Sequence, residues 1–157
     1  MQKILLSIVM LIFSSNIFAA ELWQGLQSGA TTQQVIKSFP STKIDSNRNL
    51  PAEIDNRLIM KDYMVFEKNF TVRFLMKNDR LKKVQLHTKF EKYDPVYSSA
   101  YDALSLKYGV PTKEISTVYG NSAKWSINGI EISLLDTFNN DLFITYSTEL
   151  IDNASKL

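Results

Sequence analysis

An alternation of apolar and polar residues in the middle of the chain constrains the fold more than any other feature. Apolar side chains occupy every second position of residues 70–76, and a second alternating series covers residues 83–89. Because successive side chains of a strand point to opposite faces of a sheet, both segments are predicted to be strands with one buried face. A turn at residues 78–80 joins them and residues 60–67 add a third strand, so the region is predicted to be an antiparallel meander.

The C-terminal part of the chain carries further strand and hairpin signals. Asn128–Gly129 is the strongest of them, because the tightest hairpin turns need positive φ angles that Asn and Gly adopt readily. Gly120–Asn121 marks a second tight turn. The strands predicted around these turns are residues 115–119, 123–127, 130–136 and 142–147.

Two segments have helical signals. Thr31–Gln34 has the pattern of a capping box and precedes apolar residues at helical spacing, and Pro40 ends this first helix. The second helix is predicted over residues 95–108. It begins with Asp94 as the N-cap before a proline, and it ends at Gly109.

The order helix, strands, helix, strands predicts an α+β fold made of two helix-plus-antiparallel-strand units. Two helices can cover one face of about seven strands, so we expect both helices on one face of the sheet and water on the other. The length of 157 residues, 45% of them apolar, indicates a single domain from residue 21 to residue 157. A weak internal repeat would relate residues 21–92 to 93–148, and residues 149–157 would form a flexible tail.

Residues 1–20 have the composition of a secretory signal peptide. Lys3 gives a positive start, residues 4–13 form an apolar run, and Ala19 or Ala20 offers a small residue for cleavage. The run is shorter than the roughly 20 residues that span a bilayer, and no later segment is long and apolar enough to cross one. The chain has no cysteine for lipid attachment or disulfides. We therefore expect a periplasmic or secreted protein.

The segment after the leader resembles a known family. Residues Leu22–Pro40, LWQGLQSGATTQQVIKSFP, are similar to the helix-turn-helix opening of the BamE-like family of small outer-membrane assembly lipoproteins. The two helix-plus-strand units also resemble the tandem-repeat β-lactamase inhibitor protein fold, which presents its sheet to a partner enzyme. The lipid-accepting cysteine of the BamE-like family is absent here, and no glycine precedes Pro40. The resemblance implies a docking module and assigns no activity to any residue.

The sequence lacks the residues that most known types of catalytic site require. There is no cysteine and a single histidine, His87, which excludes cysteine nucleophiles and multi-histidine metal sites. His87 falls in the polar phase of its predicted strand, and the sequence has no Gly-x-Ser-x-Gly segment and no glycine-rich phosphate loop. We therefore expect no catalytic residue, no metal and no cofactor, and we do not expect an enzyme.

The polar face of the predicted meander stands out from this background. Residues 61–92 hold nine Lys or Arg against four Asp or Glu, although the formal net charge of the chain is only +2. Such a face would attract an acidic surface of an envelope protein, and an exposed aromatic in the 137–141 turn would anchor the same partner. The simpler interpretations are a solvated sheet face and a phenylalanine folded back over its hairpin. The predicted partner-binding residues are Arg73, Lys77, Lys83, Gln85, His87, Lys89 and Phe138.

These observations favour an exported, soluble protein-binding module of the bacterial envelope, of the inhibitor, immunity or assembly-accessory type. Nucleic acid is not expected, because the aromatic residues of the meander face away from its cations. A first alternative is a carrier or sensor of a small amphipathic ligand, with a cavity lined by Tyr101, Leu104 and Trp125. A second is a cell-wall glycoside hydrolase, which needs two facing acids. Its candidates come from the group Glu53, Asp55, Asp62 and Glu67, with Glu53 and Glu67 foremost.

Overall fold

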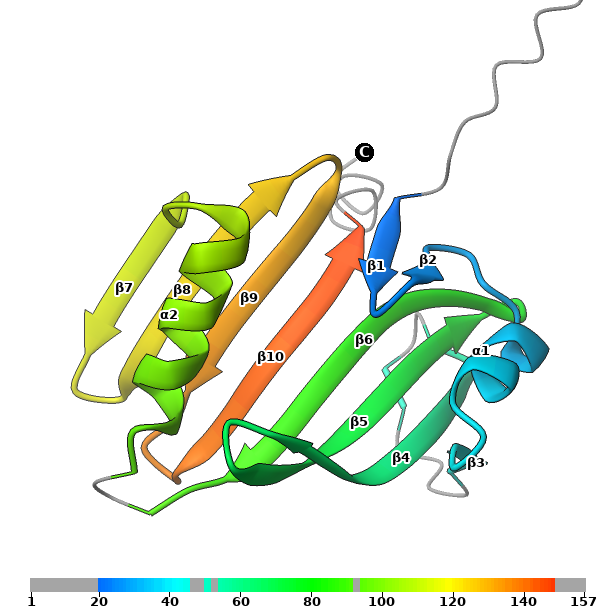
Figure 1. Ribbon diagram of the computed structural model, residues 1–157, viewed down its shortest axis with the longest axis horizontal. Helices are drawn as coiled ribbons and strands as arrows, with labels where there is room; N and C mark the ends of the chain where they lie inside the picture. The colour runs from blue at the N-terminus through cyan, green and yellow to red at the C-terminus, as the bar shows by residue number, and fades with distance from the viewer. Residues whose placement is uncertain (1–19, 46–49, 52–53, 92–93, 149–157) are drawn as a thin grey trace, which may run out of the picture.

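One antiparallel sheet dominates the fold (Figure 1). The computed structural model describes residues 20–45, 50–51, 54–91 and 94–148, of which 54% lie in strands and 17% in helices. The elements in chain order are β1 (Glu21–Trp23), β2 (Leu26–Gln27), α1 (Thr32–Ser38), β3 (Lys43–Ile44), β4 (Asn56–Val65), β5 (Lys68–Lys77), β6 (Arg80–Lys89), α2 (Val96–Tyr108), β7 (Lys113–Thr117), β8 (Gly120–Ile127), β9 (Ile130–Asp136) and β10 (Asp141–Thr148).

Within the described residues, eight strands form a single sheet in the order β3-β4-β5-β6-β10-β9-β8-β7. Every neighbouring pair is antiparallel, and the meander β4-β5-β6 confirms the prediction from the alternating pattern. Strand β6, the last strand before α2, pairs at the centre of the sheet with β10, the last strand of the chain's described part. The pairing runs from Lys89 opposite Asp141 to Lys83 opposite Ser147.

The prediction of an α+β fold made of two helix-plus-antiparallel-strand units is wrong. The described part of the chain is mostly β, and its long strands form one continuous sheet instead of two units. The β6–β10 pairing that unites them joins residues more than 50 positions apart. Hydrophobic periodicity reports which face of a strand is buried and carries no information on which distant strand lies beside it.

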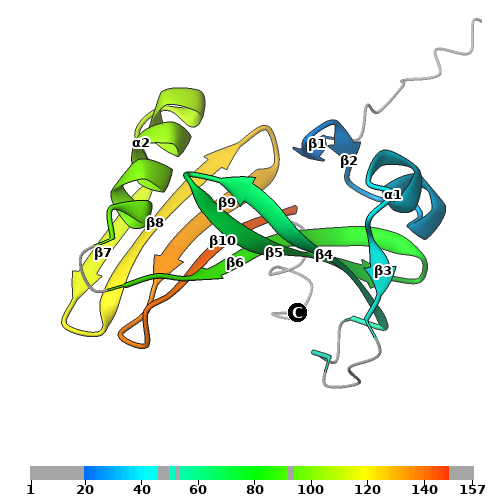
Figure 2. The ribbon, with the colours of Figure 1, turned by 60° about the horizontal axis from the view of Figure 1, so that its bottom comes forward.

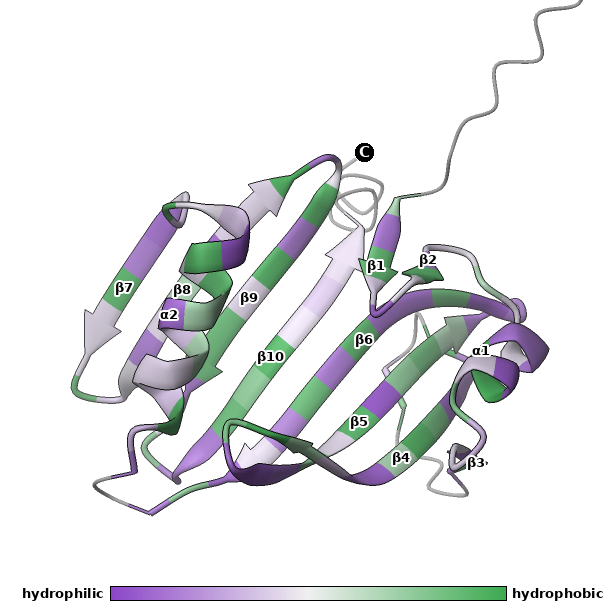
Figure 3. Ribbon diagram, viewed as in Figure 1, coloured by the Kyte–Doolittle hydropathy of each residue, from purple (hydrophilic) through white to green (hydrophobic). Residues whose placement is uncertain are grey.

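The hydrophobic core lies on one side of this sheet, which we call the inner face. Figure 2 shows α1, α2 and the β1–β2 hairpin all on that side. Helix α2 contacts β8 and β9, and β1 contacts β10 and β6. Apolar and polar residues alternate along β5 and β6 (Figure 3), as expected for strands with one covered face. The largest fully buried side chains include Trp125, Phe70, Phe74, Leu22 and Leu58.

Residues 21–27 form a strand pair, although they belong to the segment that resembles a helix-turn-helix opening. Gln24 and Gly25 both have positive φ, which closes the tight hairpin between β1 and β2. The hairpin places Trp23 in the core, with its ring centroid 5.3 Å from that of Phe39 and 5.9 Å from that of Phe74. These aromatic contacts seal the inner face beside α1.

The helix ends agree with the sequence to within one residue. At α1 the Thr31 side chain accepts a hydrogen bond from the Gln34 backbone N–H, and the Gln34 side chain accepts one from Thr31, so the capping box is confirmed. At α2 the N-cap is Pro95, one residue later than predicted. Asp94 still accepts a hydrogen bond from the Val96 N–H at 3.1 Å, so it satisfies a free donor of the first turn.

Several sequence predictions fall outside the described residues. They are the signal peptide apart from Ala20, the 149–157 tail and the hydrolase candidate Glu53. Among the described residues, neither helix combines the length and the hydropathy that crossing a membrane requires.

Candidate functional site

The side of the sheet turned away from the helices, which we call the outer face, gathers most of the predicted partner-binding residues. Strand pairing places Arg73 opposite Gln85, and Lys83 opposite Leu75. Each pair therefore lies on one face of the sheet. Residues of β7 to β10 join the same surface. Taken along the open part of the sheet, the outer face comprises Arg73, Lys83, Gln85, His87, Lys89, Asp141, Phe143, Thr145, Ser133, Leu135, Ser122, Lys124 and Ile115.

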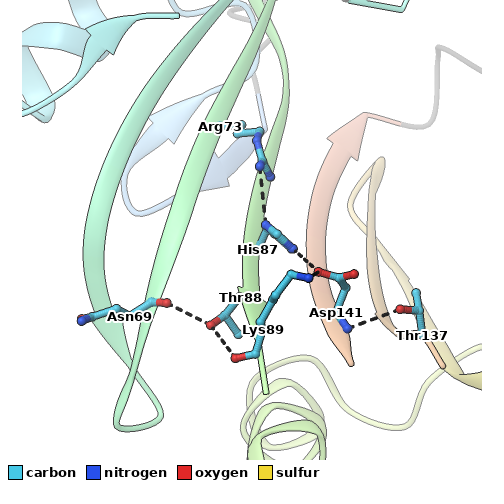
Figure 4. A network of polar contacts seen from close by, with 7 residues as sticks. All are labelled: Asn69, Arg73, His87, Thr88, Lys89, Thr137 and Asp141. Atoms are coloured by element: carbon cyan, nitrogen blue, oxygen red, sulfur yellow. Dashed lines mark hydrogen bonds and ion pairs between the residues drawn. The ribbon is translucent and has the colours of Figure 1, made fainter. Parts of the chain in front are cut away.

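His87 is the centre of a polar network that spans three strands (Figure 4). Its Nε2 lies 2.7 Å from Asp141 Oδ1, and its Nδ1 lies 3.5 Å from Arg73 Nη2. A guanidinium only donates, so the two contacts fit an imidazole that accepts at Nδ1 and donates from Nε2 to Asp141. Lys89 Nζ lies 4.0 Å from the same Asp141 oxygen. The network fixes the orientation of the imidazole ring.

The outer face carries an acid, Asp141, among the cations that the sequence placed there, so its positive charge is partly neutralised. The hydrogen bond from His87 lowers the pKa of Asp141, and the positive charge of Lys89 adds to this effect. Burial lowers the pKa of Arg73 and the nearby Arg57 lowers it further, while Asp45 acts in the opposite direction. The sequence could not place Asp141 here, because it lies 54 residues from His87.

Aromatic stacking extends the network toward β9. The rings of His87 and Phe143 stack with centroids 4.6 Å apart and planes 15° from parallel. Phe143 pairs with Leu135, Leu135 with Ser122, and Ser122 with Ile115, so the row crosses the sheet to its β7 edge. Leu135 and Ile115 are exposed. The sequence analysis missed this row, although a Leu134–Leu135 pair in one strand necessarily puts one leucine on each face.

A cluster of exposed apolar residues ends the row, at the turns that follow β7 and β9. We call Val118, Tyr119 and Phe138 the apolar tip. Their exposed fractions are 90%, 74% and 71%, and the Phe138 N–H donates to the Tyr119 carbonyl at 3.0 Å. Phe138 therefore points into solvent and is not folded over its hairpin. The sequence analysis missed Val118 and Tyr119, because it placed both in a strand at residues 115–119, whereas β7 ends at Thr117.

Lys77 is remote from the other predicted residues. It ends β5 beside the turn that contacts α1 through a hydrogen bond from the Thr32 N–H to Asp79, whereas Lys89 and Phe138 lie toward the opposite end of the sheet. Between them, Leu75 is buried although its pairing with Lys83 puts it on the outer face. The open part of the outer face thus begins at Arg73 of β5 and extends over β6, β10, β9 and β8 to β7.

The proposed ligand cavity for a carrier or sensor is filled by the residues that were expected to line it. Trp125 and Leu104 are buried, and the Tyr101 ring lies 5.9 Å from the Trp125 ring. The Trp125 indole N–H donates to the Gly109 carbonyl at 2.9 Å, which fixes the ring. The packing offers no support for a bound ligand between these three side chains.

The acids proposed for a hydrolase are dispersed. Asp55 precedes β4 and Glu67 follows it, so roughly 30 Å of strand separates them. Glu67 does line an open cleft of about 850 Å³ together with Glu91 and Asp94. Asp94, however, already pairs with Lys68 and caps α2. Asp62 is exposed at the irregularity in β4.

Among the described residues, no group of three or more His, Cys, Asp or Glu is arranged to hold a metal ion. His87 pairs with one carboxylate, that of Asp141. Asp45 pairs with the cation Arg57.

Comparison with known proteins identifies no family. No protein-family profile matches the chain. No curated protein matches it either. Among solved structures, the chain is similar to a DUF4309 family protein, YjgB from Bacillus subtilis, with a TM-score of 0.48 and 9% sequence identity over 83% of this chain and 86% of that one.

Proposed function

We propose that this chain is an exported protein-binding module of the bacterial envelope, which binds a partner protein through the outer face and the apolar tip. The observation that carries the proposal is a continuous row of side chains across the sheet. It begins at His87 and Phe143 and continues through Leu135 and Ser122 to Ile115, and the exposed residues of the tip lie in the turns that follow β7 and β9. In this proposal the protein acts by binding and has no catalytic residue.

The order of this surface favours binding. Arg73 and Asp141 hold His87, and His87 stacks on Phe143, so the centre of the face is ordered before a partner arrives. Ordering side chains on association costs free energy, and a surface that is already ordered avoids part of that cost. Aromatic residues such as Tyr119 and Phe138, both largely exposed here, are enriched at protein interfaces.

The charges of the face favour an acidic partner surface. Arg73, Lys83 and Lys89 surround the aromatic centre, while Asp141 is already engaged by His87. An acidic patch on the partner would be steered to these cations, and the association rate would fall as salt screens the charges. The proposal covers an inhibitor, an immunity factor or an assembly accessory, since each would act by binding a partner through this surface.

The proposed export depends on residues 1–20, whose charged start, apolar run and alanine pair match a signal peptide. Expression of the full chain in a bacterium, fractionation and mass determination of the purified protein test this. We expect a periplasmic or secreted product that begins at Ala20 or Glu21. An intact product in the cytoplasm would contradict export.

The binding test starts with tagged residues 21–157 and an envelope extract. Any retained protein is identified by mass spectrometry, purified and titrated against the wild type and a Tyr119→Ser/Phe138→Ser variant. We expect the double variant to weaken binding at least about tenfold, since anchor residues contribute about 2 kcal/mol or more each. A matched control is Leu106→Ser, because Leu106 is 90% exposed but lies on α2, on the inner side.

A second arm tests the charges. The triple variant Arg73→Glu, Lys83→Glu and Lys89→Glu should reduce the association rate, and Lys37→Glu on α1 is the control that changes an exposed cation on the inner side. Circular dichroism first establishes that each variant folds. Equal binding by the wild type and both outer-face variants would overturn the assignment of this face.

A further inference from the structure

A cleft that is distinct from the polar network at His87 lies between the start of α2 and strands β7 and β8. This cleft has a volume of about 350 Å³. Its strand residues Glu114, Ser116 and Asn121 point to the inner side, whereas Ile115 and Ser122, which belong to the outer face, border the cleft at the β7–β8 edge of the sheet. Its lining combines aromatic rings, a carboxylate, an amide and hydroxyl groups. The lining residues are Tyr97, Ser98, Tyr101, Glu114, Ile115, Ser116, Asn121 and Ser122.

The aromatic part of the cleft is a pair of tyrosines one helical turn apart. Their ring centroids are 6.4 Å apart and the ring planes are 26° from parallel. Tyr101 packs on the buried Trp125 and donates its hydroxyl hydrogen to Glu114, so its position is fixed. Burial raises the pKa of Tyr97 to about 12, and the negative charges of Asp136 and Glu114 contribute. Both rings are therefore neutral at ordinary pH and face a region of negative potential.

The polar part of the cleft is rich in acceptors. Asn121 uses its backbone N–H and its side-chain nitrogen to donate to Asp136, and Ser116 donates to the Asn121 side-chain oxygen at 2.7 Å. Glu114 accepts from Tyr101 through Oε1, which leaves Oε2 able to accept from a ligand. Among the described lining residues there is no Lys, Arg or His. A ligand for this cleft must therefore supply the donors and the positive charge.

We propose that this cleft binds a guanidinium group. A guanidinium is planar, so it stacks on an aromatic face, and its N–H donors match a carboxylate that has a free oxygen. Tyr97 and Tyr101 would provide the aromatic faces and Glu114 the carboxylate. Tyr97, Tyr101 and Glu114 are not part of the outer face, so either proposal can fail without the other.

The test is a titration of residues 21–157 with capped arginine, N-acetyl-L-arginine methylamide, followed by calorimetry and amide chemical shifts. We expect saturable binding in the millimolar range, with shifts concentrated at Ser98, Asn121 and Ser122. The capped citrulline analogue has the same shape without the charge, and it should bind at least about tenfold more weakly. Equal binding of the two analogues, or shifts elsewhere in the protein, would overturn the proposal.

Variants locate the site. Glu114→Gln should weaken arginine binding about tenfold, because it replaces a charge-assisted hydrogen bond by a neutral one. Glu131→Gln is the matched control, since it removes a partly exposed carboxylate on the outer face that pairs with Lys124. Tyr97→Leu should also weaken binding, while Tyr97→Phe should retain it because the ring face is kept. Unchanged affinity in both Glu114→Gln and Tyr97→Leu would refute the site.

A final arm distinguishes two sources of the guanidinium. Tighter binding of a capped Gly-Arg-Gly peptide than of agmatine would assign the cleft to an arginine side chain of a protein. Tighter binding of agmatine would assign it to a free guanidino compound. The Tyr119→Ser/Phe138→Ser variant should bind capped arginine like the wild type, and this result separates the cleft from the outer face.

Discussion

The two faces of strand β6 show how one segment serves two purposes. Val84 and Leu86 point to the inner face, where they are buried in the main core. Gln85 and His87 point to the outer face, where His87 contacts strands β5 and β10 through Arg73 and Asp141. The inner residues are held by area removed from water, and the outer ones by specific partners from other strands. One face of β6 therefore contributes to the stability of the core, and the other is available for contact with a partner.

The largest difference in stability between the two faces is expected when the buried Trp125 of the inner face is replaced. Trp125→Ala would leave a large cavity and an unpaired Gly109 carbonyl, so we expect a loss of about 4 kcal/mol in the free energy of unfolding. Leu135→Ala, on the exposed face of the next strand, should cost less than about 1 kcal/mol. Urea unfolding followed by circular dichroism measures both, and similar losses would contradict the division between the faces.

The next largest loss of stability is expected at Gly120, the first residue of β8 after the turn from β7. Gly120 has a φ of 140°, and a Cβ there would lie 2.2 Å from the Asp136 carbonyl oxygen. Gly120→Ala should therefore cost at least about 2 kcal/mol. The matched control is Gly129→Ala, where φ is 76° and the space around the Cβ is open, so we expect a cost of about 1 kcal/mol. Equal costs for the two variants would show that the close approach to Asp136 has no effect.

Alkaline pH should destabilise the inner side. The pKa of Tyr97 is raised from 10.0 to about 12, so between these values the unfolded chain loses a proton that the folded chain keeps. Stability falls as the pH rises through this window. Solvent screening reduces the effect, because Tyr97 is only partly buried. Urea midpoints at pH 8, 10 and 11 should decline less steeply in Tyr97→Phe, and an identical decline would assign the effect to other groups.

Acid pH should act on the outer face. The hydrogen bond from His87 lowers the pKa of Asp141 from its ordinary value of 3.8. The ionised carboxylate therefore stabilises the folded protein above pH 3.8, and this stabilisation is lost as the pH falls through the pKa of the folded state. Asp141→Asn should flatten the dependence of the urea midpoint on pH below about pH 4. The same slope in both proteins would show that the network adds nothing to acid stability.

The smallest effect on stability is expected at the apolar tip. Tyr119→Ser/Phe138→Ser removes two largely exposed rings, so the free energy of unfolding should change by no more than about 0.5 kcal/mol per residue. Thermal unfolding measures this directly. A large loss would mean that the tip is a structural element, and the proposed binding surface would then lose its distinguishing feature.

Both helices, most of the strands and the buried face of the long strands can be predicted from the sequence alone. The alternation in β5 and β6, the capping box at Thr31 and the Asn128–Gly129 turn are all present in the structure, because each depends on neighbours within a few residues. The cations at Arg73, Lys83 and Lys89 were assigned to one face by the same period of two.

The order of the strands in the sheet and both candidate sites depend on tertiary contacts. The pairing of β6 with β10 brings Asp141 and Phe143 to His87, and the packing of α2 on the sheet places Tyr101 against Glu114. These contacts join residues that are distant in the chain, and their formation depends on the total burial of apolar surface in the sheet. A local pattern does not encode that quantity, so the single continuous sheet, the polar network and the cleft emerge only when the whole core is assembled.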